Sequence, residues 1–190
     1  NILTYFKNEL KGVFDDREIT SLAYITMENL FGLDKSSCIL NTMKKLSLFE
    51  RERIIGIVSE LKTGKPIQYI LGETDFYGLK FLVSKAVLIP RPETEELVDW
   101  MVQSSKEKNT FLDIGTGSGC IIISLCKHLN GNFLGVDISK DALLVAKENN
   151  KHNITSVEFK QMDILDDNFD KDSFFDVIVS NPPYVLRSEL

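Results

Sequence analysis

The sequence predicts a doubly wound α/β sheet preceded by a small bundle of helices. From Thr110 onward, short apolar runs alternate with stretches of helical periodicity, and a glycine-rich turn follows the first run. Residues 2–71 instead carry apolar side chains at three- and four-residue spacing, which is helical periodicity. Strands that alternate with helices are joined by crossovers, so the sheet should be parallel, with ligands at the carboxyl ends of its strands.

The first third of the chain should be all helical. Leu3, Phe6 and Leu10 recur at helical spacing, and acids at 15 and 16 precede a second amphipathic stretch. Further helix starts are indicated at 34–36 and at 47–50, where the sequence Ser-Leu-Phe-Glu forms a capping box. Residues 64–66, Gly-Lys-Pro, should end the last of these helices, and residues 66–71 could add one or two more turns.

A change of pattern after residue 71 marks a domain boundary. Aromatic and β-branched runs on either side of Gly78 predict a β-hairpin. The run from Pro90 to Glu96 then opens a helix to about Ser105, because proline and acids suit a first helical turn. We therefore expect a helical domain, a hairpin linker and an α/β domain, over residues 1–71, 72–89 and 90–190.

Within the α/β domain, four strands and two intervening helices are expected. The strands are predicted at 110–114, 132–136, 157–159 and 174–179, and the helices at 119–129 and 140–150.

Composition and charge limit the possible functions. The net charge of −6 disfavours binding to DNA or RNA that rests mainly on electrostatics. Neither a signal peptide nor an apolar run of membrane-spanning length is evident, so we expect a cytoplasmic protein without membrane contact. The three cysteines, Cys38, Cys120 and Cys126, lack metal-ligand spacing, and we expect reduced thiols and no metal.

A glycine-rich turn after the first strand indicates a cofactor site. We call it the cofactor loop, and it consists of Gly115, Thr116, Gly117, Ser118 and Gly119. Glycines at such a turn let a ligand approach the backbone. The dinucleotide fingerprint requires Gly or Ala where this chain has Cys120, which argues against NAD. The pattern instead favours S-adenosylmethionine, which has no pyrophosphate for the loop to hold.

Two acids lie where the next strands end. Asp137 follows the second strand, and an acid there can accept hydrogen bonds from both ribose hydroxyls. Asp163 follows the third strand and could bind the adenine amino group, with Ile164 beside the ring. Alternatively, Asp137 belongs to the start of the next helix, and Asp163 is a loop acid in an acidic stretch.

The fourth strand is followed by Asn181, Pro182, Pro183 and Tyr184. A planar amide or amine nitrogen is a poor nucleophile, so a transferase must orient it and accept its N–H groups. The Asn181 side chain and the Pro182 carbonyl could supply those acceptors, the prolines would stiffen the loop, and Tyr184 could cover the substrate. The alternative is an ordinary strand-ending turn. The two histidines, His128 and His152, are expected to be solvated and without partners.

Taken together, these segments resemble the HemK/PrmC family of methyltransferases, which modify a glutamine side chain of class-one peptide chain release factors. The resemblance rests on Gly64–Gly72, Phe76–Gly78, Leu88–Glu95, Asp113–Gly119 and Asn181–Tyr184. It implies a Rossmann-like class I methyltransferase domain, a helical domain that helps to recognise the release factor, and entry of the glutamine of a Gly-Gly-Gln loop into the Asn181 pocket. Some relatives carry an aromatic residue where this chain has Ile164, so stacking on adenine should be weaker.

The resemblance also implies a sheet of seven strands, whereas this chain stops six residues after Tyr184. We therefore expect a domain truncated after its fourth strand, with that strand as an unprotected edge. Two other functions stay open. One is an adenine or cytosine amino-methyltransferase of DNA or RNA, and the other is a non-catalytic partner-binding module with a vestigial nucleotide site.

Overall fold

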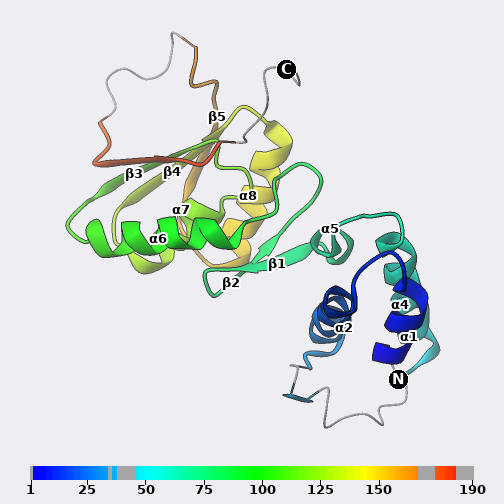
Figure 1. Ribbon diagram of the computed structural model, residues 1–190. Helices are drawn as coiled ribbons and strands as arrows, with labels where there is room; N and C mark the ends of the chain where they lie inside the picture. Colours follow the sequence, from blue (N-terminus) through cyan, green and yellow to red (C-terminus); the bar gives the residue numbers. More distant parts are fainter. Residues whose placement is uncertain (1, 34–35, 38–45, 167–173, 183–190) are drawn as a thin grey trace. The chain divides into compact units, whose positions relative to one another are not determined.

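The computed structural model describes residues 2–33, 36–37, 46–166 and 174–182. The chain divides into two compact units, Asn1–Leu71 and Gly72–Leu190 (Figure 1). Within the described ranges, none of the helices has the length and apolar character needed to cross a membrane.

The first unit is helical, as its periodicity predicted. Its helices are α1 (Ile2–Leu10), α2 (Asp16–Phe31), α4 (Leu48–Leu61) and α5 (Ile67–Leu71). The predicted helix start at Asp34 lies outside the described residues. Among the described residues, the core of this unit is formed by large apolar side chains from these helices, including Phe6, Leu10, Ile19, Leu22, Ile54, Val58, Leu61 and Ile67.

Two predicted caps fix where helices of this unit begin. The Asp15 side chain accepts hydrogen bonds from the backbone N–H groups of Arg17 and Glu18, both at 2.8 Å. At the start of α4, Ser47 and Glu50 form the complete capping box, in which the Ser47 N–H donates to the Glu50 carboxylate at 2.7 Å. Each cap satisfies N–H groups that the first turn of a helix leaves without partners.

The second unit begins with the predicted hairpin. Strands β1 (Glu73–Phe76) and β2 (Leu79–Leu82) pair antiparallel around Tyr77 and Gly78. Both turn residues have positive φ, 49° and 72°, which is the backbone of a type I′ turn. Tyr77 tolerates this conformation while its N–H donates to the Glu95 carboxylate at 2.8 Å.

A four-stranded parallel sheet follows, as the alternation of strands and helices predicted. Its strands are β3 (Thr110–Ile114), β4 (Asn132–Asp137), β5 (Glu158–Gln161) and β6 (Val177–Ser180), in the order β5-β4-β3-β6. Strand β5 begins one residue later, and β6 three residues later, than the apolar residues of the sequence predicted. Within the described part of the chain, strand β6 is an edge of the sheet, and its Ile178 side chain is 60% exposed.

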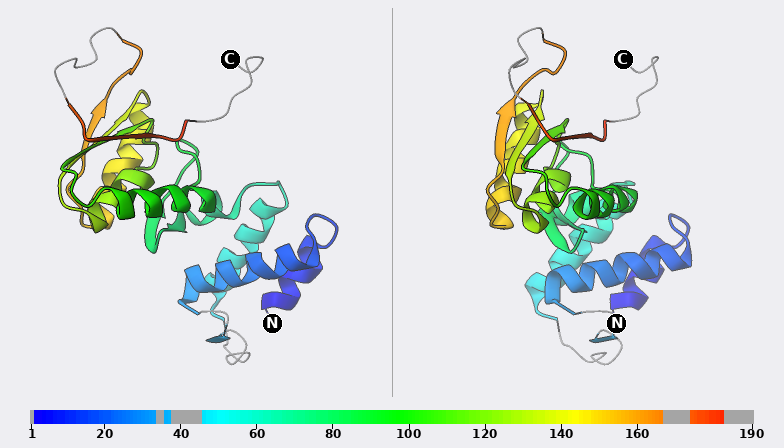
Figure 2. Two further views of the ribbon diagram at one scale, coloured as in Figure 1. Left: turned by 60° about the vertical axis from the view of Figure 1, so that its left-hand side comes forward. Right: turned by 90° about the vertical axis from the view of Figure 1, so that its left-hand side faces the viewer.

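Helices bury one face of this sheet. They are α6 (Pro92–Ser104), α7 (Cys120–His128) and α8 (Lys140–His152). Helix α7 packs on β3 and β4, and α8 packs on β4 and β5, visible in Figure 2 as the yellow helix beside the orange strand. The buried face carries Phe111 and Phe133, whose rings stack with centroids 4.8 Å apart.

The strand order sets the position of the ligand site. The chain moves outward from β3 to β4 and β5 and then returns to the other side of β3 as β6. This reversal makes the carboxyl ends of β3 and β6 a topological switch point, where open α/β sheets bind ligands. The cofactor loop and Asn181 follow these two strands directly.

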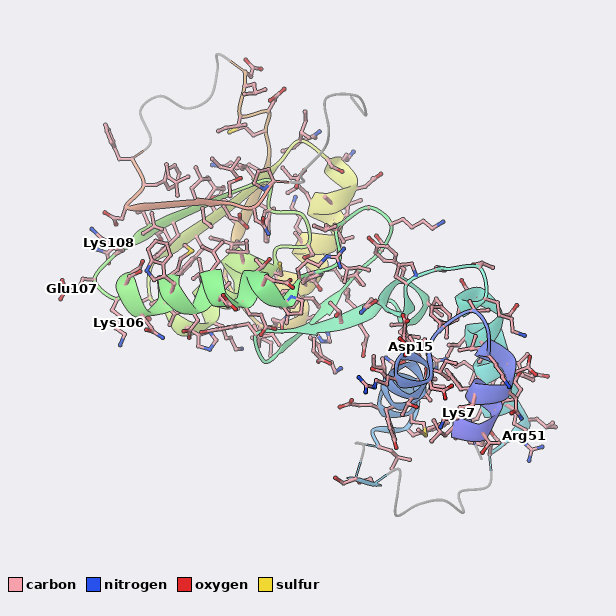
Figure 3. The ribbon with its side chains drawn as sticks, viewed as in Figure 1. Lys7, Asp15, Arg51, Lys106, Glu107 and Lys108 are labelled. Atoms are coloured by element: carbon pink, nitrogen blue, oxygen red, sulfur yellow. The ribbon has the colours of Figure 1, made fainter. Side chains whose placement is uncertain are left out.

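At the opposite edge of the sheet, where the strands begin, hydrogen bonds join the start of β3 to the residue before β6. The Asp176 carboxylate accepts hydrogen bonds from the N–H groups of Asn109 and Thr110, at 2.8 and 3.1 Å. These bonds hold the pKa of Asp176 below its ordinary value. Figure 3 shows Lys106, Glu107 and Lys108 in the exposed loop that leads into β3. These charges therefore lie at the edge away from the switch point.

Candidate cofactor and acceptor site

The cofactor loop folds back over the end of β4. The N–H groups of Gly115 and Thr116 both donate to the Val136 carbonyl at 2.9 Å. The Gly119 N–H then donates to the Thr116 carbonyl at 2.8 Å, which closes the loop immediately before α7. Gly115 and Gly117 have φ of 71° and 55°, in the left-handed region that favours glycine. The predicted loop is therefore present at the predicted place.

The space around these glycines fits a ligand that approaches the backbone. A Cβ atom added at Gly115 would meet nothing within 4 Å. At Gly135, on β4, an added Cβ would lie 2.7 Å from the Phe159 ring and 3.0 Å from Thr116 Oγ1. The missing side chain at Gly135 thus lets the loop settle onto the sheet, while the backbone around Gly115 is open.

A buried carboxyl group lies beneath the loop. Asp113, on β3, is 1% exposed, and its Oδ2 accepts a hydrogen bond from Thr116 Oγ1 at 2.7 Å. Its Oδ1 has no hydrogen-bond partner within the described part of the chain. Burial is the main cause that raises the pKa of Asp113 to about 7; the nearby Asp137 also acts to raise this pKa, whereas hydrogen bonding to Thr116 and to the Ile122 backbone acts to lower it. An acceptor under the loop fits a ligand that carries ammonium or N–H groups.

Asp137 ends β4 beside the loop, as predicted, and it also orders local backbone. Its Oδ2 accepts from the Gly117 N–H and its Oδ1 from the Ser139 N–H, both at 2.9 Å. A carboxylate has about four lone-pair positions, so each oxygen keeps capacity for a ribose hydroxyl. The helix-start interpretation is also satisfied, because Ser139 caps α8 through its side chain.

Asp163 and Ile164 follow the neighbouring strand β5. The Met162 N–H donates to the Asp137 carbonyl at 3.0 Å, which brings this segment to the same carboxyl edge as Asp137. Asp163 is exposed, and its Oδ1 accepts from the Leu165 N–H at 2.9 Å. Ile164 is 36% exposed, so an apolar surface is available at this position.

Asn181 lies half-buried directly after β6. Its Nδ2 donates to Thr94 Oγ1, on α6, at 3.0 Å. The preceding Ser180 hydroxyl donates to the Ile114 carbonyl at 2.8 Å, which fastens the end of β6 to the end of β3. Pro182 is exposed, whereas Pro183 and Tyr184 lie outside the described residues. The structure therefore brings the start of the predicted acceptor motif to the switch point.

Comparison with known proteins gives the family. Residues 1–72 match the PrmC N-terminal domain, and residues 105–188 match a methyltransferase domain. The release factor glutamine methyltransferase of Flavobacterium psychrophilum is 44% identical over 100% of this chain and 68% of its own length. The chain belongs to the release factor glutamine methyltransferase family. The Bacteroides thetaiotaomicron and Streptococcus pneumoniae members are each 37% identical over 99% of this chain, and it covers 68% and 66% of their lengths.

Membership in the release factor glutamine methyltransferase family confirms the fold, the enzyme class and S-adenosylmethionine as the cofactor expected from the loop. The chain spans about two thirds of the length of the two relatives most fully covered here. The roles of the individual site residues in binding the cofactor and the substrate remain predictions.

Two residues of the site were missed by the sequence reasoning. Thr94 lies in the proline-rich helix start and was considered only as part of it. Asn149, on α8, is fully buried, and its Nδ2 donates to the Ser118 carbonyl at 2.9 Å and the Leu82 carbonyl at 3.0 Å. A signal for it exists, because Asn149 follows Ala142 and Ala146 on the buried stripe of α8. A polar side chain in such a stripe needs partners.

The expectation for His128 was wrong in one respect. The side chain is exposed, as expected, but its Nδ1 lies 2.8 Å from the Ser124 carbonyl and its ring packs edge-on against Tyr77, with centroids 5.1 Å apart.

Proposed function

We propose that the full-length protein transfers a methyl group from S-adenosylmethionine to the side-chain amide nitrogen of a glutamine in a class-one peptide chain release factor. The observation that carries this proposal is the polar amide of Asn181 at the switch point, next to the cofactor loop, in a chain of the release factor glutamine methyltransferase family. The glutamine is that of the Gly-Gly-Gln loop. The free cysteines Cys120 and Cys126 support a reducing, cytoplasmic setting.

Asn181 has the chemistry to orient a planar nitrogen. With Nδ2 donating to Thr94, its Oδ1 lies on the other side of the amide and can accept an N–H of the glutamine. The Pro182 carbonyl is the second proposed acceptor, and proline adds no competing N–H. Holding both N–H groups turns the nitrogen lone pair toward the methyl group. Pro183 and Tyr184 complete the proposed pocket.

The cofactor is proposed to lie over the cofactor loop. When bound, it supplies a methyl group on a sulfonium centre. Gly115 and Gly117 offer open backbone, Asp137 would accept both ribose hydroxyls, and Asp163 and Ile164 would receive the adenine. Asp113 lies under the loop and contributes negative potential when it is ionised.

The helical unit is proposed to recognise the release factor as a protein. Lys7, Asp15 and Arg51 are exposed on three different parts of this unit and mix both signs of charge (Figure 3). Mixed signs suit complementarity to another protein surface better than binding to a phosphate backbone.

The test is methyl transfer from labelled S-adenosylmethionine by the full-length protein. Purified release factor, the same factor with its loop glutamine replaced by alanine, and duplex DNA, transfer RNA and ribosomal RNA are offered in parallel. We expect label only on the unaltered factor. Label on nucleic acid alone would support the amino-methyltransferase alternative. Cofactor binding without transfer to any of them would favour a non-catalytic module.

A further inference from the structure

We propose that Thr94 is a positioning residue that sets the plane of the Asn181 side-chain amide. This inference rests on the proposed role of Asn181 as the acceptor of a substrate N–H. The hydrogen bond from Asn181 Nδ2 to Thr94 Oγ1 is 3.0 Å long and joins residues 87 positions apart in the chain. Thr94 is 8% exposed, so the bond is largely shielded from competing water.

The Thr94 hydroxyl is used differently from those of the two threonines in α2. In α2, Thr20 and Thr26 donate to carbonyls four residues earlier, at 2.7 and 2.8 Å. That is the ordinary use of a threonine hydroxyl inside a helix. Thr94 lies in the first turn of α6, where its N–H donates to the Arg91 carbonyl at 3.0 Å. Its hydroxyl instead accepts from Asn181 Nδ2, which lies outside the helix.

Both partners stand on fixed backbone. Helix α6 buries Val98 completely in the core, and its Glu95 carboxylate accepts from the Tyr77 N–H at 2.8 Å. On the other side, the bond from Ser180 to the Ile114 carbonyl holds the chain immediately before Asn181. With the two backbones held, the Thr94 contact restrains the freedom that the Asn181 side chain keeps, including rotation of its amide about the terminal torsion. That torsion is broad and roughly two-fold, so an external partner is needed to hold the plane of the amide.

The selected orientation matters for the reaction. If the amide rotates by half a turn, it presents N–H groups where the substrate also has N–H groups, and two donors repel each other. With Nδ2 held by Thr94, Oδ1 faces the other way and offers an acceptor. Loss of the Thr94 hydroxyl should therefore slow methyl transfer and leave cofactor affinity unchanged.

The experiment uses the full-length protein and its release factor substrate, with single-turnover transfer rates and calorimetric S-adenosylmethionine binding. Thr94→Val removes the hydroxyl at nearly constant volume, and Thr94→Ser keeps it. Ser104→Ala is the matched control, because Ser104 lies on the same helix and its hydroxyl donates within that helix, to the Trp100 carbonyl. Asn181→Ala is measured alongside.

We expect Thr94→Val to lower the transfer rate about tenfold, the equivalent of one hydrogen bond, with the cofactor dissociation constant changed less than about twofold. Thr94→Ser should recover most of the rate, and Ser104→Ala should match the parent protein. If Thr94→Val does not fold, Thr94→Ala replaces it under the same expectation.

Three results would overturn the inference. A normal rate for Thr94→Val beside an inactive Asn181→Ala would reject the role of Thr94 alone and leave the proposed function standing. Equal loss in the Val and Ser variants, or a parallel loss of cofactor affinity, would indicate a merely structural role. A normal rate for Asn181→Ala would remove both the role of Asn181 and the inference that rests on it.

Discussion

Oδ2 of Asp137 accepts a hydrogen bond from the Gly117 N–H at 2.9 Å, and this contact joins the end of β4 to the middle of the cofactor loop. The same carboxylate accepts from the Ser139 N–H at the start of α8. Asp137 therefore shapes the loop before any ligand arrives. A group that holds the loop and also offers acceptors to a ribose contributes to cofactor affinity in two ways, by direct contact and by pre-organisation.

We predict that Asp137→Ala weakens S-adenosylmethionine binding by ~2–4 kcal/mol while the protein stays folded, because charge-assisted contacts to two hydroxyls are lost. Calorimetric titration of the full-length protein measures the change, and thermal melting checks the fold. Asp141→Ala is the control, since Asp141 is an exposed acid in the first turn of α8 and its loss changes the net charge equally. An affinity equal to that of the control would reject the assignment of Asp137.

A second prediction concerns Asn149, which joins the hairpin to the cofactor loop. Its Oδ1 accepts from the Leu82 N–H at 2.6 Å, while its Nδ2 donates to the carbonyls of Leu82 and Ser118. Asn149→Ala leaves these buried groups without their partner, so we expect the free energy of unfolding to fall by ~2–4 kcal/mol. Urea denaturation measures it. The exposed Lys147→Ala on the same helix should change it by less than about 0.5 kcal/mol, and an equally small effect of Asn149→Ala would contradict the prediction.

The sequence predicts the site residues that belong to a local motif, but it does not predict contacts between residues far apart in the chain. The cofactor loop and Asp137 are recognisable because glycines and an acid follow predicted strands, and the register of a parallel sheet then places them together. Thr94 and Asn181 lie 87 positions apart, and no local pattern connects them. The start of β6 was also predicted too early. Phe174 extends the apolar run of the sequence, but its side chain is exposed and it does not belong to the strand.

The third prediction is a pH dependence caused by Asp113. Its pKa is about 7 in the fold, because burial disfavours the charged form, against 3.8 for the ordinary group. The folded state thus binds more protons than the unfolded state between these values, and the free energy of unfolding falls as the pH rises through this window. The loss of unfolding free energy is complete above pH 7 and is about 4 kcal/mol at most.

Asp113→Asn should remove this dependence. In urea denaturation of the cofactor-free protein, the variant should gain stability relative to the parent as the pH is raised from 5 to 8, with the largest gain above pH 7. The difference between the two proteins isolates Asp113 from other titrating groups. Asp141→Asn, at an exposed position, should show no such trend. A difference between Asp113→Asn and the parent that stays constant with pH would contradict a raised pKa for Asp113.

The last prediction concerns Asn181. Asn181→Ala should abolish methyl transfer to the release factor and leave the affinity for S-adenosylmethionine nearly unchanged, because its Oδ1 is assigned to the substrate nitrogen. Loss of one oriented electrostatic contact typically lowers the rate ~10²–10³-fold, which corresponds to an activation barrier raised by about 2.7–4 kcal/mol.

A second variant, Asn181→Asp, separates the effect of charge from that of geometry. It keeps an acceptor but replaces the donor to Thr94 by a second oxygen, which the Thr94 hydroxyl can meet only by donating. The added negative charge should tighten binding of the cationic cofactor while transfer stays slow. Single-turnover rates and cofactor titrations on the same samples test both parts, and near-normal transfer by the alanine variant would exclude Asn181 from the mechanism.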